Sequence, residues 1–208
     1  MRKIIISSMI QKEKADERFI PREFCIPIDP FIRHFERYFQ CVKILKRFGA
    51  KEKWLDCACG SGYGTNFLTN FAEFVIGYDI DKGAIEYGNK NYKNSHCAFV
   101  SDIQHYNDEF DVVISVETIE HMPKEDAKVF LKTLKTALKV GGTLVITTPI
   151  VLETNENPVN KFHYIEYSHN DFMNLLLSSG LKVESHHMVK TLFTDGEMKD
   201  QGYYKCQA

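Results

Sequence analysis

The sequence predicts an α/β fold built on a doubly wound, seven-stranded and mostly parallel sheet. Short β-type runs alternate with segments of helical periodicity, a pattern typical of βαβ units. Two of these runs, VVISV (112–116) and LVITT (144–148), are unbroken and mostly apolar, as strands covered on both faces are. A glycine cluster follows the first run, at the place where the chain must turn from strand to helix.

The first half of the chain supplies three strands and three helices. Apolar residues at helical spacing predict a helix from Pro30 to about Phe48, with Asp29 as its cap. Asp81 is expected to cap a later helix. Beyond the first helix, the chain predicts strands at 54–58, 73–79 and 97–102 and helices at 63–70 and 81–91.

The second half continues the alternation and ends in two strands. A strand is expected at 110–117, a helix from Pro123 to about Lys139 that Gly141-Gly142 ends, and a strand at 143–149. The stretch 150–168 has no clear period and predicts a long loop, a feature that is often functional. A helix at 170–179 stops at Gly180, and strands at 181–190 and 202–208 form an antiparallel edge around a loop with Asp195-Gly196.

Composition limits the classes of function. A chain of 208 residues with 44% hydrophobic and 26% charged residues suits one globular domain with a small appendage. The net charge of -2 argues against nucleic acid as a partner. No apolar run approaches the roughly 18 residues of a membrane span, and a charged run directly after the N-terminal residues argues against a signal peptide. We therefore expect a cytoplasmic protein whose six cysteines are free thiols.

The glycine cluster indicates a nucleotide-type ligand. The segment runs Asp56-Cys-Ala-Cys-Gly60-Ser-Gly62-Tyr-Gly64, and glycines allow a ligand to approach the backbone closely. Asp79 lies nineteen residues after Gly60, at the end of the next strand, where a carboxylate accepts hydrogen bonds from a ribose diol. The third glycine of a dinucleotide fingerprint would fall at Thr65, which argues against an NAD-binding oxidoreductase.

This segment resembles the first motif of the class I S-adenosylmethionine (SAM)-dependent methyltransferases. The resemblance covers residues 52–190 and includes FDVVISVETIEHM and LKVGGTLVITTP as the fourth-strand and fifth-strand motifs. It implies that Asp79 holds the cofactor ribose and that Asp102, beside Ile103, reads the adenine amine. Ala58 departs from the glycine that many members carry.

The resemblance also implies a Rossmann-like fold and a division of the chain. The segment ERFIPREF…DPFIRHFERYF (17–39) resembles a stretch of small methyltransferases of sugar and glycan pathways that folds over the cofactor pocket, which implies that residues 1–50 form a helical lid. This comparison places Phe19, His34 and Tyr38 near the methionine end, although the two aromatic residues would equally suit the core. Residues 51–208 form the SAM-binding domain, and the expected cofactor residues are Asp56, Ala58, Gly60, Gly62, Tyr63, Asp79, Ile80, Asp102, Ile103 and Glu117.

The acceptor site is expected after the fourth strand, where α/β sheets place their ligands. If the chain is helical there, Glu117, Glu120 and His121 share one face. The ExxEH pattern resembles a motif of ubiquinone-pathway O-methyltransferases and of small-RNA 3′-terminal 2′-O-methyltransferases, in which two glutamates and two histidines hold a divalent metal. With His163 as the second histidine, Glu117, Glu120 and His121 would complete such a metal site.

Several alternatives stay open for this site. His121 with Glu117 could act as a metal-free base, as a pair of metal ligands, or as structural residues. We predict a SAM-dependent methyltransferase that acts on a hydroxyl of a sugar-containing small-molecule acceptor, with His121 and Glu117 as catalytic residues. Methylation of a terminal RNA ribose and a non-catalytic SAM-binding subunit are the two alternative functions.

Overall fold

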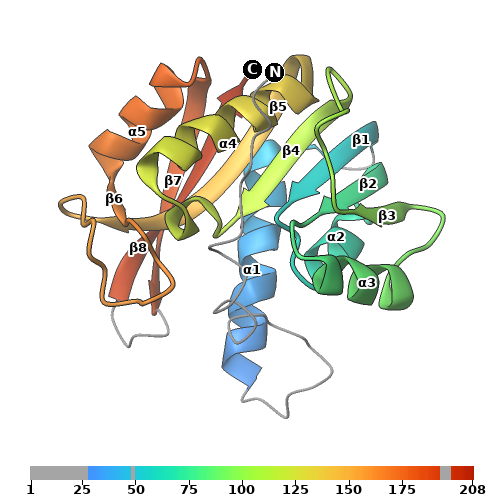
Figure 1. The fold of residues 1–208 in the computed structure, drawn as a ribbon, viewed down its shortest axis with the longest axis horizontal. Helices are drawn as coiled ribbons and strands as arrows, with labels where there is room; N and C mark the ends of the chain where they lie inside the picture. The colour runs from blue at the N-terminus through green and yellow to red at the C-terminus, as the bar shows by residue number, and fades with distance from the viewer. Residues whose placement is uncertain (1–27, 48–49, 193–197) are drawn as a thin grey trace.

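The computed structural model describes residues 28–47, 50–192 and 198–208, so Phe19 and the Asp195-Gly196 loop lie outside the described residues. Strands and helices alternate as predicted (Figure 1). The elements are α1 (Ile28–Leu45), β1 (Ala50–Cys57), α2 (Tyr63–Leu68), β2 (Ala72–Tyr78), α3 (Lys82–Asn91), β3 (Cys97–Val100), β4 (Phe110–Val116), the 3-10 turn η2 (Ile119–His121), α4 (Lys124–Ala137), β5 (Leu138–Val151), β6 (Tyr167–Ser168), α5 (His169–Ser178), β7 (Lys182–Leu192) and β8 (Met198–Gln207).

One sheet organises the described part of the chain. Its strand order is β3-β2-β1-β4-β5-β8-β7, and the two-residue strand β6 pairs with β5 beside this path. Strands β1 to β5 pair in parallel, whereas β8 is antiparallel to both β5 and β7. The predicted α/β fold class and its antiparallel edge are therefore confirmed. The eighth strand lies inside the predicted 150–168 loop and is too short for a pattern of alternating residues to reveal it.

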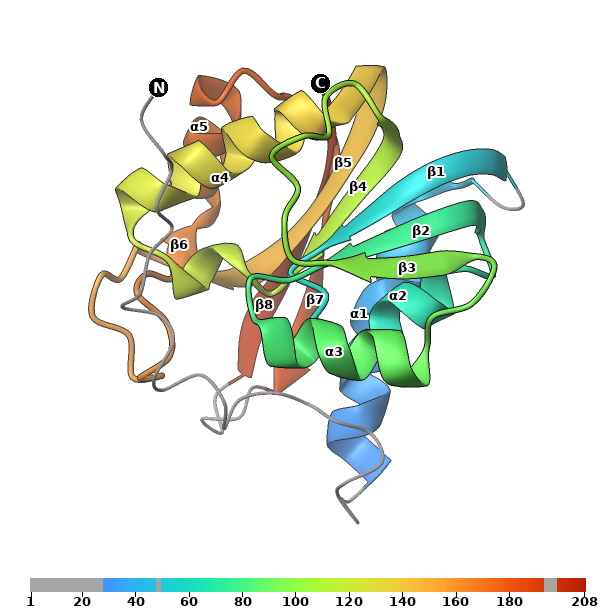
Figure 2. The same ribbon diagram turned by 45° about the vertical axis from the view of Figure 1, so that its right-hand side comes forward.

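Helices cover both faces of the sheet (Figures 1 and 2). One core cluster joins α4 and α5 to Leu55 and Val113, and the other joins α1, α2 and α3 to Trp54 and Val112. Neighbouring residues of β1 and β4 thus enter different cores, because successive side chains of a strand point to opposite faces. This alternation explains why residues 112–116 of β4 read as a mostly apolar run.

Helix α1 is an integral part of the second core. Its residues Tyr38, Cys41, Val42 and Leu45 are buried against the sheet. The helix begins at Ile28, so the expected cap Asp29 lies inside its first turn. Among the described residues, no helix has both the length and the apolar character needed to cross a membrane.

Local signals correctly predicted one helix boundary and misplaced another. The Asp81 side chain accepts a hydrogen bond from the Ala84 amide at 3.0 Å and caps α3 as expected. The expected end of α4 at Gly141-Gly142 is wrong, because the helix ends at Ala137 and both glycines lie in β5. A Cβ atom on Gly142 would lie 3.2 Å from the Phe110 carbonyl oxygen, so this glycine serves a close strand contact.

Gly64 provides a test of how α1 packs on α2. A Cβ atom at this position would lie 2.0 Å from Cζ of Tyr38, whose ring is buried. We expect Gly64→Ala to lower the free energy of unfolding by about 1–3 kcal/mol because the ring must move. Urea unfolding measures this loss. The same substitution in a Tyr38→Ala background should cost little, and an equal cost in both backgrounds would contradict the packing argument.

Candidate functional site

The parallel register places the expected cofactor residues at one edge of the sheet. Asp56 of β1 lies opposite Gly77 of β2, and Tyr78 of β2 lies opposite Val100 of β3. The three strands therefore end side by side, and the segments that follow them begin at a common edge. These segments carry the glycine loop, Asp79-Ile80 and Asp102-Ile103, respectively.

The loop after β1 has a backbone that favours glycine. Ala58, Gly60 and Gly62 have φ angles of 65°, 54° and 90°, in the left-handed region. A Cβ atom on Gly62 would lie 2.5 Å from the Phe99 ring, whereas one on Gly60 would meet nothing within 4 Å. The loop thus packs against the protein at Gly62 and borders open space at Gly60. Ala58 carries the strain of an L-residue in this region, where glycine would be unstrained.

Asp79 connects the loops that follow β1 and β2. Its Oδ2 accepts a hydrogen bond from the Gly60 amide at 2.9 Å, and its Oδ1 accepts one from the Asp81 amide at 2.9 Å. The half-buried carboxylate therefore lies beside the open space at Gly60, as a ribose-binding acid requires.

The adenine-side residues differ in exposure. Asp102 is exposed and accepts a hydrogen bond from the Gln104 amide, and Ile80 is 39% exposed. The side chain of Ile103 is only 5% exposed and belongs to the core that includes α4, and its expected place in the cofactor site stays a prediction.

Two further expected cofactor residues have protein partners. The fully buried Asp56 accepts hydrogen bonds from the Tyr38 hydroxyl at 3.2 Å and from Thr65 Oγ1 at 2.7 Å. Burial raises the pKa of Asp56 to about 7, against the opposing effect of these hydrogen bonds. The Tyr63 hydroxyl lies 3.0 Å from His34 Nδ1, and its ring packs edge-on against Tyr38. Asp56 and Tyr63, which flank the glycine loop, therefore link it to α1 through hydrogen bonds with Tyr38 and His34.

Glu117 does not share a helical face with Glu120 and His121. It has a φ of 50°, and η2 begins two residues later, so the helical spacing expected for these residues is wrong. Its Oε1 accepts hydrogen bonds from Thr147 and Gln201, and its Oε2 lies 3.5 Å from the Arg37 guanidinium. Glu117 therefore connects α1, β4, β5 and β8, and it is not among the grouped metal-type ligands.

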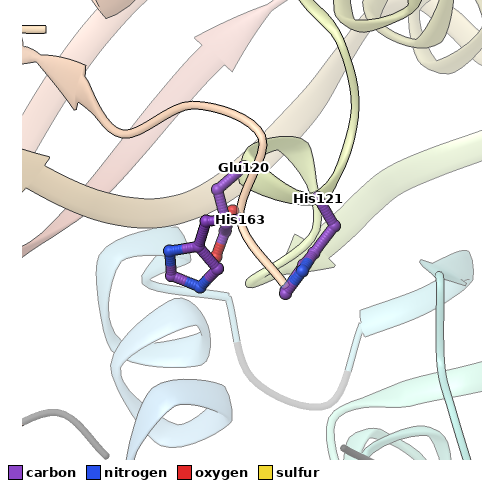
Figure 3. Close-up of side chains that lie close together, drawn as sticks. All are labelled: Glu120, His121 and His163. Atoms are coloured by element: carbon purple, nitrogen blue, oxygen red, sulfur yellow. The ribbon is translucent and has the colours of Figure 1, made fainter. Parts of the chain in front are cut away.

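The other three expected metal ligands do come together. Glu120 and His121 lie on η2, and His163 reaches them from the loop before β6 (Figure 3). One ligand atom from each lies within 4.8 Å of the others, and the two imidazole rings meet edge-on with centroids 5.0 Å apart. The structure therefore brings together three of the four residues expected at the metal site, and their role as metal ligands stays a prediction.

Glu120 is a buried acid, and one of its carboxylate oxygens has no hydrogen-bond partner among the described residues. Its side chain is fully buried, Oε2 accepts a hydrogen bond from Thr148 at 3.0 Å, and Oε1 has no hydrogen-bond partner among the described residues. Burial raises its pKa well above the usual range, and the nearby Glu117 charge raises it further. An oxygen in this state suits a proton or a cation beside the two histidines.

A turn that the sequence analysis did not single out orients the histidines. His121 Nδ1 lies 2.9 Å from the Phe162 carbonyl oxygen, so this nitrogen donates and Nε2 carries the lone pair of the neutral ring. His163 contacts Glu166 through Nδ1 and Asn160 through Nε2. Only the proximity of Asn160 and Glu166 to His163 in the sequence could have suggested these partners.

Comparison with known proteins identifies the domain. Residues 55–146 match the family described as a methyltransferase domain. A Mycolicibacterium smegmatis protein, named as a probable S-adenosylmethionine-dependent methyltransferase, is 28% identical over 141 residues, which is 62% of this chain and 52% of that protein. By this match, residues 55–146 carry a methyltransferase domain. It spans about half the length of this curated relative.

Solved structures agree with the methyltransferase domain at the level of the fold. The S-adenosylmethionine-dependent methyltransferase of Mesorhizobium loti has a TM-score of 0.64 at 13% identity and covers 83% of this chain and 98% of its own. The 1,6-didemethyltoxoflavin-N1-methyltransferase of Burkholderia thailandensis, solved with S-adenosylhomocysteine, has a TM-score of 0.65 at 14% identity and covers 83% of this chain and 76% of its own. The predicted cofactor, SAM, agrees with the matching methyltransferase model and with the relative named as SAM-dependent.

The raised pKa of Asp56 predicts a dependence of stability on pH. Between pH 3.8, the ordinary pKa of an aspartate, and about pH 7, the native protein holds a proton on Asp56 that the unfolded chain has lost. The free energy of unfolding should therefore fall as pH rises across this window, by up to about 1.4 kcal/mol per pH unit. Asp56→Asn should flatten this slope in denaturant unfolding from pH 4 to pH 8. The exposed Asp126→Asn serves as the control, and an unchanged slope in Asp56→Asn would contradict the prediction.

Proposed function

We propose that the protein is a SAM-dependent methyltransferase that transfers a methyl group to a hydroxyl of a sugar-containing small molecule. The observation that carries this proposal is the position of two oriented histidines at the end of β4, in a sheet whose neighbouring strands end in the SAM motifs. A reactive hydroxyl at the end of β4 would thus lie between the cofactor edge and His121. The Burkholderia thailandensis relative supports a small acceptor, since its name gives a small molecule as its substrate.

The residues of the chain have distinct roles in this proposal. Bound SAM would supply a methyl group on its sulfonium sulfur, and S-adenosylhomocysteine would be the leaving group when the acceptor oxygen bonds to the methyl carbon. Gly60 and Asp79 bind the ribose, and Asp102 accepts a hydrogen bond from the adenine amine. His121 takes the acceptor's hydroxyl proton at Nε2, because its Nδ1–H is held by the Phe162 carbonyl. Much of the remaining rate enhancement comes from positioning the two reactants.

Glu117 fits a positioning role better than the role of base expected for it. Both of its carboxylate oxygens face partners in the protein, namely Thr147 and Gln201 at Oε1 and Arg37 at Oε2. We propose that Glu117 shapes the end of β4 beside the cofactor while His121 alone moves the proton.

A metal-assisted reaction is the second candidate, and the grouping of Glu120, His121 and His163 favours it. The spare buried oxygen of Glu120 and two imidazole nitrogens form a donor set that suits a divalent cation such as Mn²⁺. A cation held there would lower the pKa of a vicinal diol, as a terminal RNA ribose presents. The net charge of -2 favours a small diol over RNA.

SAM binding tests the cofactor assignment. Asp79→Ala should weaken SAM binding by about ten-fold or more in calorimetric titration, because charged hydrogen bonds to the ribose are lost. Glu86→Ala, which removes an exposed carboxylate from α3, should leave the affinity unchanged. NADH should give no binding heat. An unaltered SAM affinity in Asp79→Ala would refute the role given to this residue.

Turnover tests the acceptor site. With a panel of sugars and vicinal diols, His121→Ala should lower S-adenosylhomocysteine formation by about 10²–10⁴-fold and leave SAM affinity intact. The exposed His105→Ala is the matched control. Loss of activity in EDTA that Mn²⁺ restores would favour the metal-assisted candidate, and EDTA resistance would favour the metal-free base. SAM binding without turnover on any hydroxyl would instead indicate a non-catalytic subunit.

A further inference from the structure

Both ring nitrogens of His163 are engaged by the protein. Nδ1 lies 2.8 Å from Glu166 Oε1, and Nε2 lies 2.9 Å from the side-chain nitrogen of Asn160. A ligand can reach either nitrogen only by displacing one of these partners. The chemistry of the three side chains indicates which partner leaves.

The turn around Asn160 fixes the direction of each hydrogen bond. Asn160 Oδ1 accepts from the Phe162 amide at 3.0 Å, so the amide NH₂ group must be the end that faces His163. Because an NH₂ group only donates, Nε2 of His163 is the acceptor. The proton of the neutral ring therefore resides on Nδ1, which donates it to Glu166.

The two partners of His163 differ in how firmly they are held. The Glu166 side chain is 3% exposed, and its backbone pairs with that of Asn155 through two hydrogen bonds of 2.8 and 2.9 Å. Asn160 is half-buried in a surface turn. A carboxylate behind a histidine is the usual arrangement for keeping Nδ1 protonated and directing Nε2 toward a cation. Asn160 is therefore the partner that can leave without disturbing the core.

We propose that His163 Nε2 exchanges the Asn160 amide for a divalent cation, while Glu166 retains the Nδ1 proton as a positioning residue. In this arrangement Asn160 occupies the ligand position in the absence of the cation and competes with it. The proposal rests on the metal-assisted candidate function. It adds two residues, Asn160 and Glu166, that act on cation affinity in opposite directions.

Calorimetric titration of the full chain with Mn²⁺ tests the exchange. Asn160→Ala should tighten Mn²⁺ binding by about three- to ten-fold, because one competing hydrogen bond is removed. Asn160→Ser should do the same while its hydroxyl still accepts from the Phe162 amide, which controls for a change in the turn. Asn157→Ala, an exposed change in the same loop, should have no effect. Equal or weaker Mn²⁺ binding in both Asn160 variants would overturn the proposal.

Variants of Glu166 test the positioning role. Glu166→Ala should weaken Mn²⁺ binding by about ten-fold or more, whereas Glu166→Gln, which still accepts from Nδ1–H, should lose much less. Nitrogen NMR of the cation-free protein should show His163 with its proton on Nδ1. A proton on Nε2, or equal losses in the two Glu166 variants, would contradict the assignment.

SAM titration in the same samples separates failure of this inference from failure of the proposed methyltransferase function. If neither the wild type nor the two Asn160 variants bind Mn²⁺ while SAM binding is intact, the exchange and the metal-assisted candidate are refuted. The methyltransferase proposal would then still stand. Loss of SAM binding in the wild type would instead remove the methyltransferase proposal.

Discussion

The parallel register of β1, β2, β3 and β4 is the constraint on which the candidate site depends. Because these strands run in one direction, the segments that follow them meet at one edge of the sheet. The register also fixes which face each side chain occupies, since a shift of one residue would turn the whole strand over. Such a shift in β1 would remove Asp56 from Tyr38 and Thr65 and place Cys57 there instead. The polar site and the apolar cores are therefore set by the same pairing.

Four buried polar side chains lie in or near the candidate site. Asp56, Glu120, Glu166 and Gln201 are each almost fully buried, although burying such groups is costly unless they are hydrogen-bonded. Asp56 has two hydroxyl donors, and Glu166 has the Nδ1–H of His163. The two exceptions, Glu120 Oε1 and Gln201 Oε1, belong to side chains in or next to the candidate acceptor site. These two oxygens, which lack a hydrogen-bond partner among the described residues, thus lie in the region where we expect ligands.

The features that the sequence predicted are those that local chemistry determines. The glycine loop, the Asp81 cap and the buried runs of β4 and β5 each depend on neighbours within a few residues, and the structure has them as expected. Glu117 was misjudged because its partners Arg37 and Gln201 are 80 and 84 residues away, and no periodicity records such contacts. The burial of the Ile103 side chain was likewise not predicted, because a residue next to a binding acid can equally well enter the core.

The place of β8 in the sheet has a consequence for synthesis. This strand follows β7 along the chain, yet it lies between β7 and β5. While a ribosome is still making residues 198–207, the edge of β5 that pairs with β8 is unpaired, and β7 lacks the strand through which it joins the sheet. Vectorial folding from the N-terminus can therefore assemble β1 to β5 early but must leave an apolar edge open until Gln207 emerges. A ribosome that stalls just before this point would carry a partly formed sheet with an exposed, unpaired strand edge. Chaperones bind nascent chains of this kind.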